Sequence, residues 1–208
     1  MHGPEIAPRV SALGEVLGER AGGVRSAAAG IVLCEQLALN LFDLRGKPRH
    51  ADFLTSANDV LRTGLPLVPN TSATGDIGTA LWLGPDQWLL SCRRTYETLP
   101  IVGGSLTDVS HGRVCIRVGG PHVRELLAKG CGLDLHHHAF VAGQCAQSLL
   151  ANVPVLLHCI DGGMEFNLYC DRSYARHLWY WLIDAADEFG FEDQSRGAGF
   201  AGRESGSF

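Results

Sequence analysis

The chain has 208 residues, of which 46% are hydrophobic and 19% are charged, and its formal net charge is −5. This composition is typical of a folded globular protein and excludes a chain that is disordered over most of its length. The acidic balance argues against the basic surface that nucleic acids or anionic membranes require, so we expect neither partner. The sequence has no uninterrupted apolar run of about 18 residues, so we expect no membrane-spanning helix.

Seven cysteines lie at wide spacings, and most of them stand within apolar runs. An odd number without paired spacing does not indicate a disulfide framework, and a reduced cysteine in an apolar run behaves as a small hydrophobe. The first twenty residues lack a cationic segment followed by an unbroken apolar core, which a signal peptide would carry. We therefore expect a reduced, cytoplasmic protein.

Both ends of the chain differ in composition from its centre. Residues 1–30 are rich in Ala, Gly and Ser, and residues 12–20 place Leu13 and Val16 at helical spacing. We interpret 1–30 as an N-terminal arm with a short helix, loosely held unless a partner covers it. Residues 194–208 are rich in Gly and Ser and are predicted to form a flexible tail.

The core is predicted to span residues 31–193, and its first half runs to about residue 105. The expected elements are strands at 31–34 and 37–44, a helix opened by residues 46–48 and continuing to 54, a loop over 64–75, and strands at 79–83 and 88–92. Pro85 presets the backbone of the four-residue turn between the last two strands, so these strands should form a hairpin.

The second half, about 106–193, repeats the order of strand, glycine-opened helix, loop and hairpin. The expected elements are a strand at 114–118, a helix opened by residues 119–121, a loop with Phe140 and Gly143, strands at 153–159 and 165–170, and an amphipathic helix at 173–189. Gly130 is the expected left-handed C-terminus of the first helix, and Ser173 the expected N-cap of the last. The repeated order predicts an α+β fold, a pseudo-duplicated core of mixed or antiparallel sheets with packed helices.

Residues 106–140 read LTDVSHGRVCIRVGGPHVRELLAKGCGLDLHHHAF. This segment resembles the aminomethyltransferase superfamily, to which the glycine-cleavage T-proteins belong. Its members carry an Asp-Val-Ser-His element, a Gly-Pro helix start, an Asp-Leu step and a Phe-x-x-Gly element. The corresponding positions here are 108–111, 120–121, 134–135 and 140–143.

A closer resemblance links residues 34–190 to the gamma subunits of heterotetrameric sarcosine oxidases. The similar stretches are LWLGPDQWLL at 81–90, LAKGC at 127–131, VPVLLH at 153–158, RSYA at 172–175 and WL at 181–182. The resemblance implies an aminomethyltransferase-like fold and a complex with alpha, beta and delta subunits. That complex would demethylate sarcosine oxidatively to glycine and hydrogen peroxide, and pass the one-carbon unit to tetrahydrofolate or release it as formaldehyde. The resemblance also implies that FAD, FMN, NAD and tetrahydrofolate belong to partner subunits, with no cofactor in this chain.

The sequence departs from the transferases at one position that matters for chemistry. The transferases place an acidic residue just before the strand that follows the Phe-x-x-Gly element. This region reads SLLANVP at 148–154, and no Asp or Glu occurs between Asp134 and Asp161. Asn152 can form hydrogen bonds, but it supplies no negative charge to stabilise a developing cation or to act as a base. We therefore predict that this chain has no catalytic residue and serves as a scaffold.

Several other polar residues are candidate sites. Residues 136–138 are three histidines, but adjacent side chains are expected to point different ways and the sequence lacks zinc-ligand spacing, which favours a polar loop. Ser110 and His111 are neighbours expected to face opposite sides, which favours a structural turn over a catalytic pair. Cys145 is read as a buried thiol in preference to a reactive one. Residues 119–121 lack the three-glycine nucleotide fingerprint and fit a helix start.

The four tryptophans can serve as interface anchors or as core residues. Trp179 and Trp181 stand two positions apart in a predicted helix, so one is expected in the core and the other exposed.

Two further functions remain open. One is a stand-alone folate-binding or transfer protein, and the other is the same scaffold in a complex that demethylates dimethylglycine or another N-methyl amine.

Overall fold

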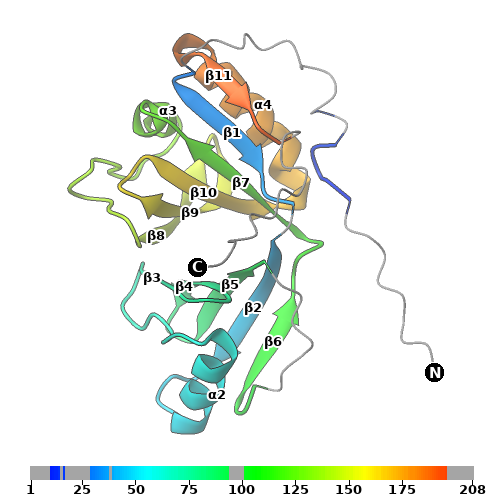
Figure 1. Ribbon diagram of the computed structural model, residues 1–208, viewed down its shortest axis with the longest axis vertical. Coiled ribbons are helices and arrows are strands. Elements are labelled where there is room, and N and C mark those ends of the chain that lie inside the picture. Colours follow the sequence, from blue (N-terminus) through cyan, green and yellow to red (C-terminus); the bar gives the residue numbers. More distant parts are fainter. Residues whose placement is uncertain (1–9, 15, 17–28, 38, 94–100, 196–208) are drawn as a thin grey trace, which may run out of the picture.

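The computed structural model describes residues 10–14, 16, 29–37, 39–93 and 101–195. Two β-sheets lie one above the other, and helices cover their outer faces (Figure 1). The architecture is α+β, and the predicted fold class is confirmed. Among the described residues, no helix is long and apolar enough to cross a membrane.

The larger sheet has six strands in the order β11-β1-β7-β10-β9-β8. Their bounds are β1 (Ile31–Glu35), β7 (Arg113–Gly119), β8 (Cys145–Leu150), β9 (Val153–Asp161), β10 (Glu165–Asp171) and β11 (Phe191–Asp193). Every neighbouring pair is antiparallel except β1 and β11, which run parallel. The hairpin of β9 and β10 turns at Gly162 and Gly163, which both adopt positive φ, as the predicted turn requires.

The smaller sheet has five antiparallel strands in the order β3-β4-β5-β2-β6. Their bounds are β2 (Asn40–Gly46), β3 (Ser72–Thr74), β4 (Gly78–Gly84), β5 (Gln87–Cys92) and β6 (Gly104–Asp108). The hairpin of β4 and β5 turns at Pro85 and Asp86, which confirms that prediction.

The two sheets have the same plan, because each half of the chain gives its first strand to the other half. The order β3-β4-β5-β2-β6 matches β8-β9-β10-β7-β1 element for element. β1 precedes β2 in the chain but pairs with β7, and β6 precedes β7 but pairs with β2. Figure 1 shows the chain passing between the sheets at these two places. The pseudo-duplication is therefore a strand exchange, and neither sheet is built from one half alone.

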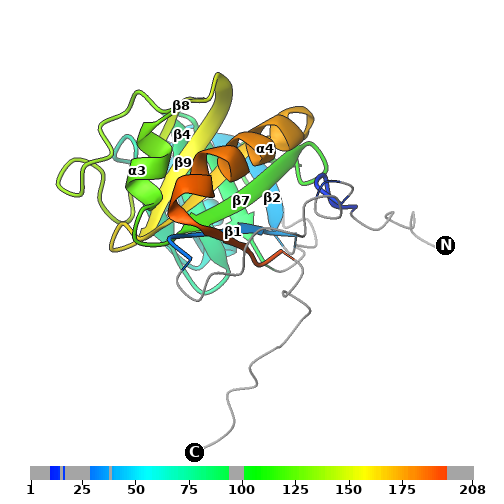
Figure 2. The same cartoon turned by 90° about the horizontal axis from the view of Figure 1, so that it is seen from above.

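Three helices complete the outer layers. α2 (Ala51–Leu61) packs Phe53, Ala57 and Leu61 against the smaller sheet, beside the buried Trp88. α3 (Val123–Ala128) and α4 (Ala175–Ala186) cover the outer face of the larger sheet (Figure 2), and short 3-10 turns flank α4 on both sides. The helix predicted to end at residue 54 continues to Leu61, since its buried residues recur at threes and fours through that point.

Trp88 and Trp179 are fully buried, whereas Trp82 and Trp181 are half-buried. Trp179 confirms the predicted core position, but Trp181 is not exposed as expected. The ring of Trp181 lies over Gly130, where an added Cβ would come within 2.6 Å of it. Gly130 does not have the positive φ that was predicted. A glycine stands here because of this close approach and not because of the helix C-terminus.

Ser173 does not cap α4. The helix begins after a 3-10 turn at Arg172–Tyr174, and its N-cap is Tyr174 without a side-chain cap hydrogen bond. The prediction was wrong because this turn places the N-cap one residue further along the chain.

The described part of the N-terminal arm is attached to the core and is not loosely held. Leu13 and Val16 are buried in the main cluster, which lies between the larger sheet and the helices on its outer face. Ser11 donates a hydrogen bond to the buried carboxylate of Glu35, and Arg172 donates to the carbonyls of Val10 and Ser11. The predicted helix at 12–20 falls mostly outside the described residues, as does the tail from residue 196 onward.

Arg124 of α3 holds a long loop in place. Its guanidinium donates to the carbonyls of Leu135, Phe140 and Gly163, and it lies over the ring of Phe166. One side chain thereby joins the loop after α3 to the turn between β9 and β10, because a guanidinium offers five donors in a fixed plane.

Candidate functional site

An apolar cluster and a cavity that opens to solvent lie between the two sheets. The cluster contains side chains from both sheets, among them Leu41, Leu81, Leu156 and Tyr169. Beside it lies a cavity of about 460 Å³, which falls within the usual size of a small-molecule site. β3, β4 and β5 contribute one wall and β7, β9 and β10 the other, so the two sheets of the fold meet at this space.

A row of side chains crosses the larger sheet on the face toward the cavity. Arg117 of β7 pairs with Asn167 of β10, which in turn pairs with His158 of β9. The row continues to Cys34 of β1 at one end and to Cys145 of β8 at the other. Residues directly opposite one another in neighbouring strands have their side chains on the same face. The row is therefore a product of strand register, which brings Cys34, Arg117 and Asn167 together from distant parts of the sequence.

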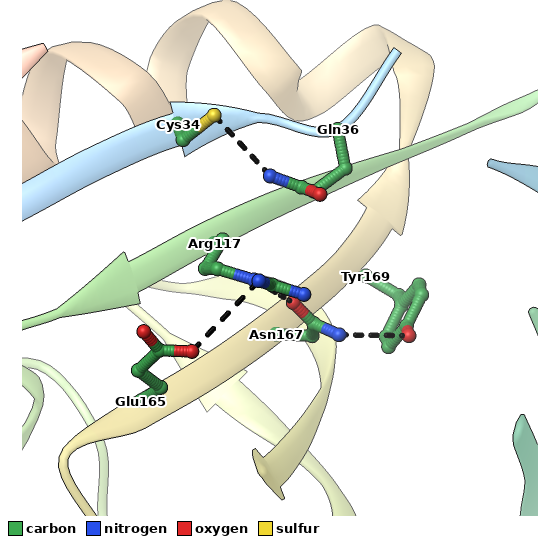
Figure 3. Close-up of polar contacts among 6 residues, drawn as sticks. All are labelled: Cys34, Gln36, Arg117, Glu165, Asn167 and Tyr169. Carbon is green, nitrogen blue, oxygen red and sulfur yellow. Dashed lines mark hydrogen bonds and ion pairs between the residues drawn. The ribbon is translucent and has the colours of Figure 1, made fainter. Parts of the chain in front are cut away.

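Arg117 is the charged centre of this row (Figure 3). Its Nε donates a hydrogen bond of 3.3 Å to Oδ1 of Asn167, and its Nη1 lies 3.8 Å from Oε2 of Glu165. The amide of Asn167 donates in turn to the hydroxyl of Tyr169 at 3.3 Å. Tyr169 is fully buried, and its burial raises the pKa of the phenol above the ordinary value, so it stays neutral. The network fixes a cation against a wall of neutral polar groups.

His158 lines the cavity and is 5% exposed. Its Nε2 lies 3.0 Å from the hydroxyl of Ser72, which donates its own hydrogen to the carbonyl of Gly143. A serine hydroxyl has one hydrogen, so Nε2 must carry the proton that this contact requires. Nδ1 is therefore the unprotonated acceptor, and it is buried without a partner among the residues that the structure describes. Burial, and then the charge of Arg117, lower the pKa of His158 to about 4.

The residues that sequence reasoning weighed as sites lie elsewhere or are engaged in structure. Asn152 is exposed in the two-residue turn between β8 and β9, where it and Ala151 both have positive φ. Asparagine adopts positive φ more readily than most residues, which accounts for its presence in this turn. Asn152 does not line the cavity.

Ser110 and His111 lie in the turn before β7 and diverge as expected. Ser110 is buried, and its hydroxyl accepts from the amide of Leu41 at 2.8 Å and lies 3.3 Å from the same residue's carbonyl. His111 is exposed.

Cys145 is fully buried between the sheets, and burial raises the pKa of its thiol to about 11. Thiol chemistry needs the thiolate, so a buried thiol with a raised pKa is unreactive near neutral pH.

The three histidines at 136–138 gather more closely than their order suggested. The rings of His136 and His137 are 4.1 Å apart and those of His137 and His138 are 3.9 Å apart, so the expectation that they point different ways was wrong. In the described parts of the chain, no group of three or more His, Cys, Asp or Glu residues is placed to hold a metal. Gly120 has φ 117°, and a Cβ added there would clash with the carbonyl of Gly30, which explains a glycine at this position without a nucleotide.

As a chemical site, the cavity is suited to binding. It offers a fixed guanidinium, one neutral imidazole and several hydroxyl groups. Its serine–histidine contact, between Ser72 and His158, has the imidazole as donor, because the hydroxyl hydrogen is given to the carbonyl of Gly143, so the histidine is not placed to take the serine proton. Sequence reasoning did not single out Arg117, His158 or Asn167. The available signal was strand alternation, because Arg117 and Cys115 must face away from Val114, Ile116 and Val118.

Comparison with known proteins agrees with this architecture. The sarcosine oxidase, gamma subunit family matches over residues 45–188. Sarcosine oxidase subunit gamma from Corynebacterium sp. (strain U-96) is 35% identical over 183 residues, covering 84% of each chain. The same subunit from an Arthrobacter species is 33% identical over 172 residues, covering 79% of this chain and 84% of the relative.

Solved structures extend the comparison to the fold. A chain of the heterotetrameric sarcosine oxidase from Corynebacterium sp. U-96, determined with pyrrole 2-carboxylate, superimposes with a TM-score of 0.75 and 28% identity. The match covers 87% of this chain and 96% of that one. Aminomethyltransferase T of the glycine cleavage system from Bartonella henselae shares the fold, with a TM-score of 0.54 and 16% identity over 80% of this chain and 48% of the transferase. The chain therefore belongs to the sarcosine oxidase gamma subunit family.

Proposed function

We propose that the chain is a non-catalytic, scaffolding subunit of a heterotetrameric sarcosine oxidase with alpha, beta and delta partners. The complex would convert sarcosine to glycine with release of hydrogen peroxide, and its one-carbon unit would pass to tetrahydrofolate or leave as formaldehyde. FAD, FMN, NAD and tetrahydrofolate would be bound by the partner subunits. We place the assembled complex in the cytoplasm, where the reduced state of seven unpaired cysteines is maintained.

The observation that carries the scaffolding role is the state of the candidate nucleophiles. The hydroxyl of Ser110 is used by the backbone of Leu41, and the thiol of Cys145 is buried in the apolar cluster between the sheets. Neither has a general base in hydrogen-bond contact, which nucleophilic catalysis requires. The region in which the resemblance to transferases implies an acid is 148–154, and its Asn152 is an exposed turn residue whose amide does not titrate.

The proposal is tested by rebuilding the full complex with Ser110→Ala, His111→Ala, Cys145→Ala or Asn152→Ala in this chain. Sarcosine turnover is then measured per assembled flavin, and the yield of complex is measured separately. A scaffold predicts that yield falls for the buried positions while turnover per flavin holds. General acid–base groups contribute about 10²–10⁴-fold to rate. A drop of about 100-fold per flavin in any variant that assembles fully would therefore refute the proposal.

A further inference from the structure

We propose that the cavity between the sheets binds a small monocarboxylate with an apolar body, held by the guanidinium of Arg117. The inference concerns a ligand site within this chain. It does not depend on the scaffolding role, because a subunit without catalytic residues can still bind a ligand.

Arg117 is a charged residue in an interior strand of the larger sheet. It stands within β7, which is paired with β1 on one edge and with β10 on the other. Its side chain points to the space between the sheets. The side chain is 32% exposed, so most of it is removed from bulk water. Charged groups in such positions are normally paired, since removing a charge from water without a partner is costly.

The guanidinium is only partly paired by the protein. Its Nε donates to Asn167, whereas the closest acidic oxygen, on Glu165, is 3.8 Å from Nη1 and beyond hydrogen-bond length. Neither Nη group has a hydrogen-bond acceptor among the described residues. Asn167 is itself fixed by the hydroxyl of Tyr169, so the plane of the guanidinium is oriented. Its two Nη groups remain without a hydrogen-bond acceptor among the described residues. A planar pair of donors matches the two oxygens of a carboxylate.

The charges around the cavity favour a single negative charge on the ligand. Its described lining carries two cations, Arg117 and Arg93, and one anion, Asp76. His158 adds no charge near neutral pH, because its buried ring is neutral. The lining residues alone therefore carry about one positive charge, and Glu165, which reaches Nη1 of Arg117 at 3.8 Å from outside the lining, reduces the field further. This balance suits a ligand with one negative charge better than a phosphate or a dicarboxylate.

The remaining walls favour an apolar ligand body. Leu39, Ile77 and Ile160 line the same cavity as Arg117. Small-molecule sites characteristically combine apolar walls with a few placed polar groups that fix orientation. The volume of about 460 Å³ has room for a single ring or a short branched chain beside the carboxylate.

The test uses benzoate as the probe, with the full-length chain and isothermal titration calorimetry. Benzamide is the neutral control of the same shape, and inorganic phosphate is the control for charge without an apolar body. We expect saturable binding of benzoate and about 10-fold weaker binding, or none, for both controls. Equal binding of benzoate and benzamide, tighter binding of phosphate, or no binding of benzoate would each overturn the proposal.

Variants locate the site. Arg117→Met should weaken benzoate binding by about 10-fold or more, and Arg117→Lys should retain only part of it, since lysine keeps the charge and loses the planar fork. Arg49→Met, at an exposed residue outside the cavity, should bind as the unaltered chain does. If Arg117→Met does not fold, the arginine Nε–H signals of the unaltered chain in a ¹⁵N NMR titration decide. A shift of the Arg117 signal supports the proposal, and shifts confined to other arginines refute it.

Discussion

His158 should make the stability of this protein depend on pH in mildly acidic solution. The ordinary pKa of histidine is 6.5, and burial lowers that of His158 to about 4 in the folded chain. The folded state therefore favours the neutral ring. Its contribution to stability is complete above the unfolded pKa of 6.5 and is lost as the pH falls toward the folded pKa of about 4.

The magnitude follows from the size of the shift. Each pKa unit corresponds to about 1.4 kcal/mol, so the full loss, reached below both pKa values, is about 3 kcal/mol. At pH 4.5 most of the unfolded chains carry a proton on this residue and most of the folded chains do not. The expected loss of unfolding free energy between pH 7.5 and pH 4.5 is then about 2.5 kcal/mol from this residue alone.

The substitution His158→Gln isolates this contribution, because an amide can still donate to Ser72 but does not titrate. Urea unfolding of both chains at pH 7.5 and pH 4.5 gives four free energies. The difference between the two chains should change by about 2.5 kcal/mol in favour of the variant as the pH falls. His111→Gln, at an exposed histidine, corrects for titration elsewhere. A difference that stays constant across the two pH values would show that burial does not keep the ring neutral. The neutral charge assigned to His158 in the cavity wall would then be wrong.

Three further predictions concern single residues, each measured by urea unfolding of the full chain. Arg124→Met removes the donor to three carbonyls and should cost about 2–4 kcal/mol, whereas a cost below about 0.5 kcal/mol would mean that the loop is held by other contacts. Gly130→Ala forces a methyl group against a tryptophan ring and should cost about 1–3 kcal/mol, while Gly132→Ala, with open space around it, should be neutral or slightly stabilising. Ser110→Ala should cost about 1–3 kcal/mol and His111→Ala less than about 0.5 kcal/mol, and equal costs would contradict the structural role of the serine.

The fold class and the central strands could be predicted from the sequence because their signals are local. Pro85 and the glycines at 162–163 mark tight turns between apolar strands, and both hairpins formed as predicted. The four strands that sequence reasoning missed are β3, β6, β8 and β11, and these are the four edges of the two sheets. An edge strand pairs on one side only, so it needs neither a continuous apolar run nor strict alternation. β6 illustrates this, since four of its five residues are exposed.

The cavity could not be predicted in the same way. Its polar row depends on the register that places Arg117 opposite Asn167, and Asn167 opposite His158. Within each strand, the sequence shows only that the face carrying these residues is less apolar than the opposite face of the same strand. The hairpin that pairs Asn167 with His158 has a local signal, but nothing local indicates that β7 lies beside β10, because Arg117 and Asn167 are 50 residues apart in the chain. The burial of Cys145 was easier to predict, since a cysteine without a reactive motif around it behaves as a small hydrophobe.

The strand exchange explains why the element most suggestive of catalysis has a structural position. The chain crosses from the larger sheet to the smaller one between β1 and β2, and crosses back between β6 and β7. Leu41 lies just after the first crossing and Ser110 within the second. The hydroxyl of Ser110 binds the backbone amide of Leu41, and the amide of Val109 donates to the carbonyl of Leu41 at 2.9 Å. The two crossings are thus joined to each other, and this joint sets how the sheets face one another across the cavity. A serine is suited to this place because its short side chain can both donate and accept within a buried turn. The Asp-Val-Ser-His element therefore secures the exchange on which both walls of the cavity depend.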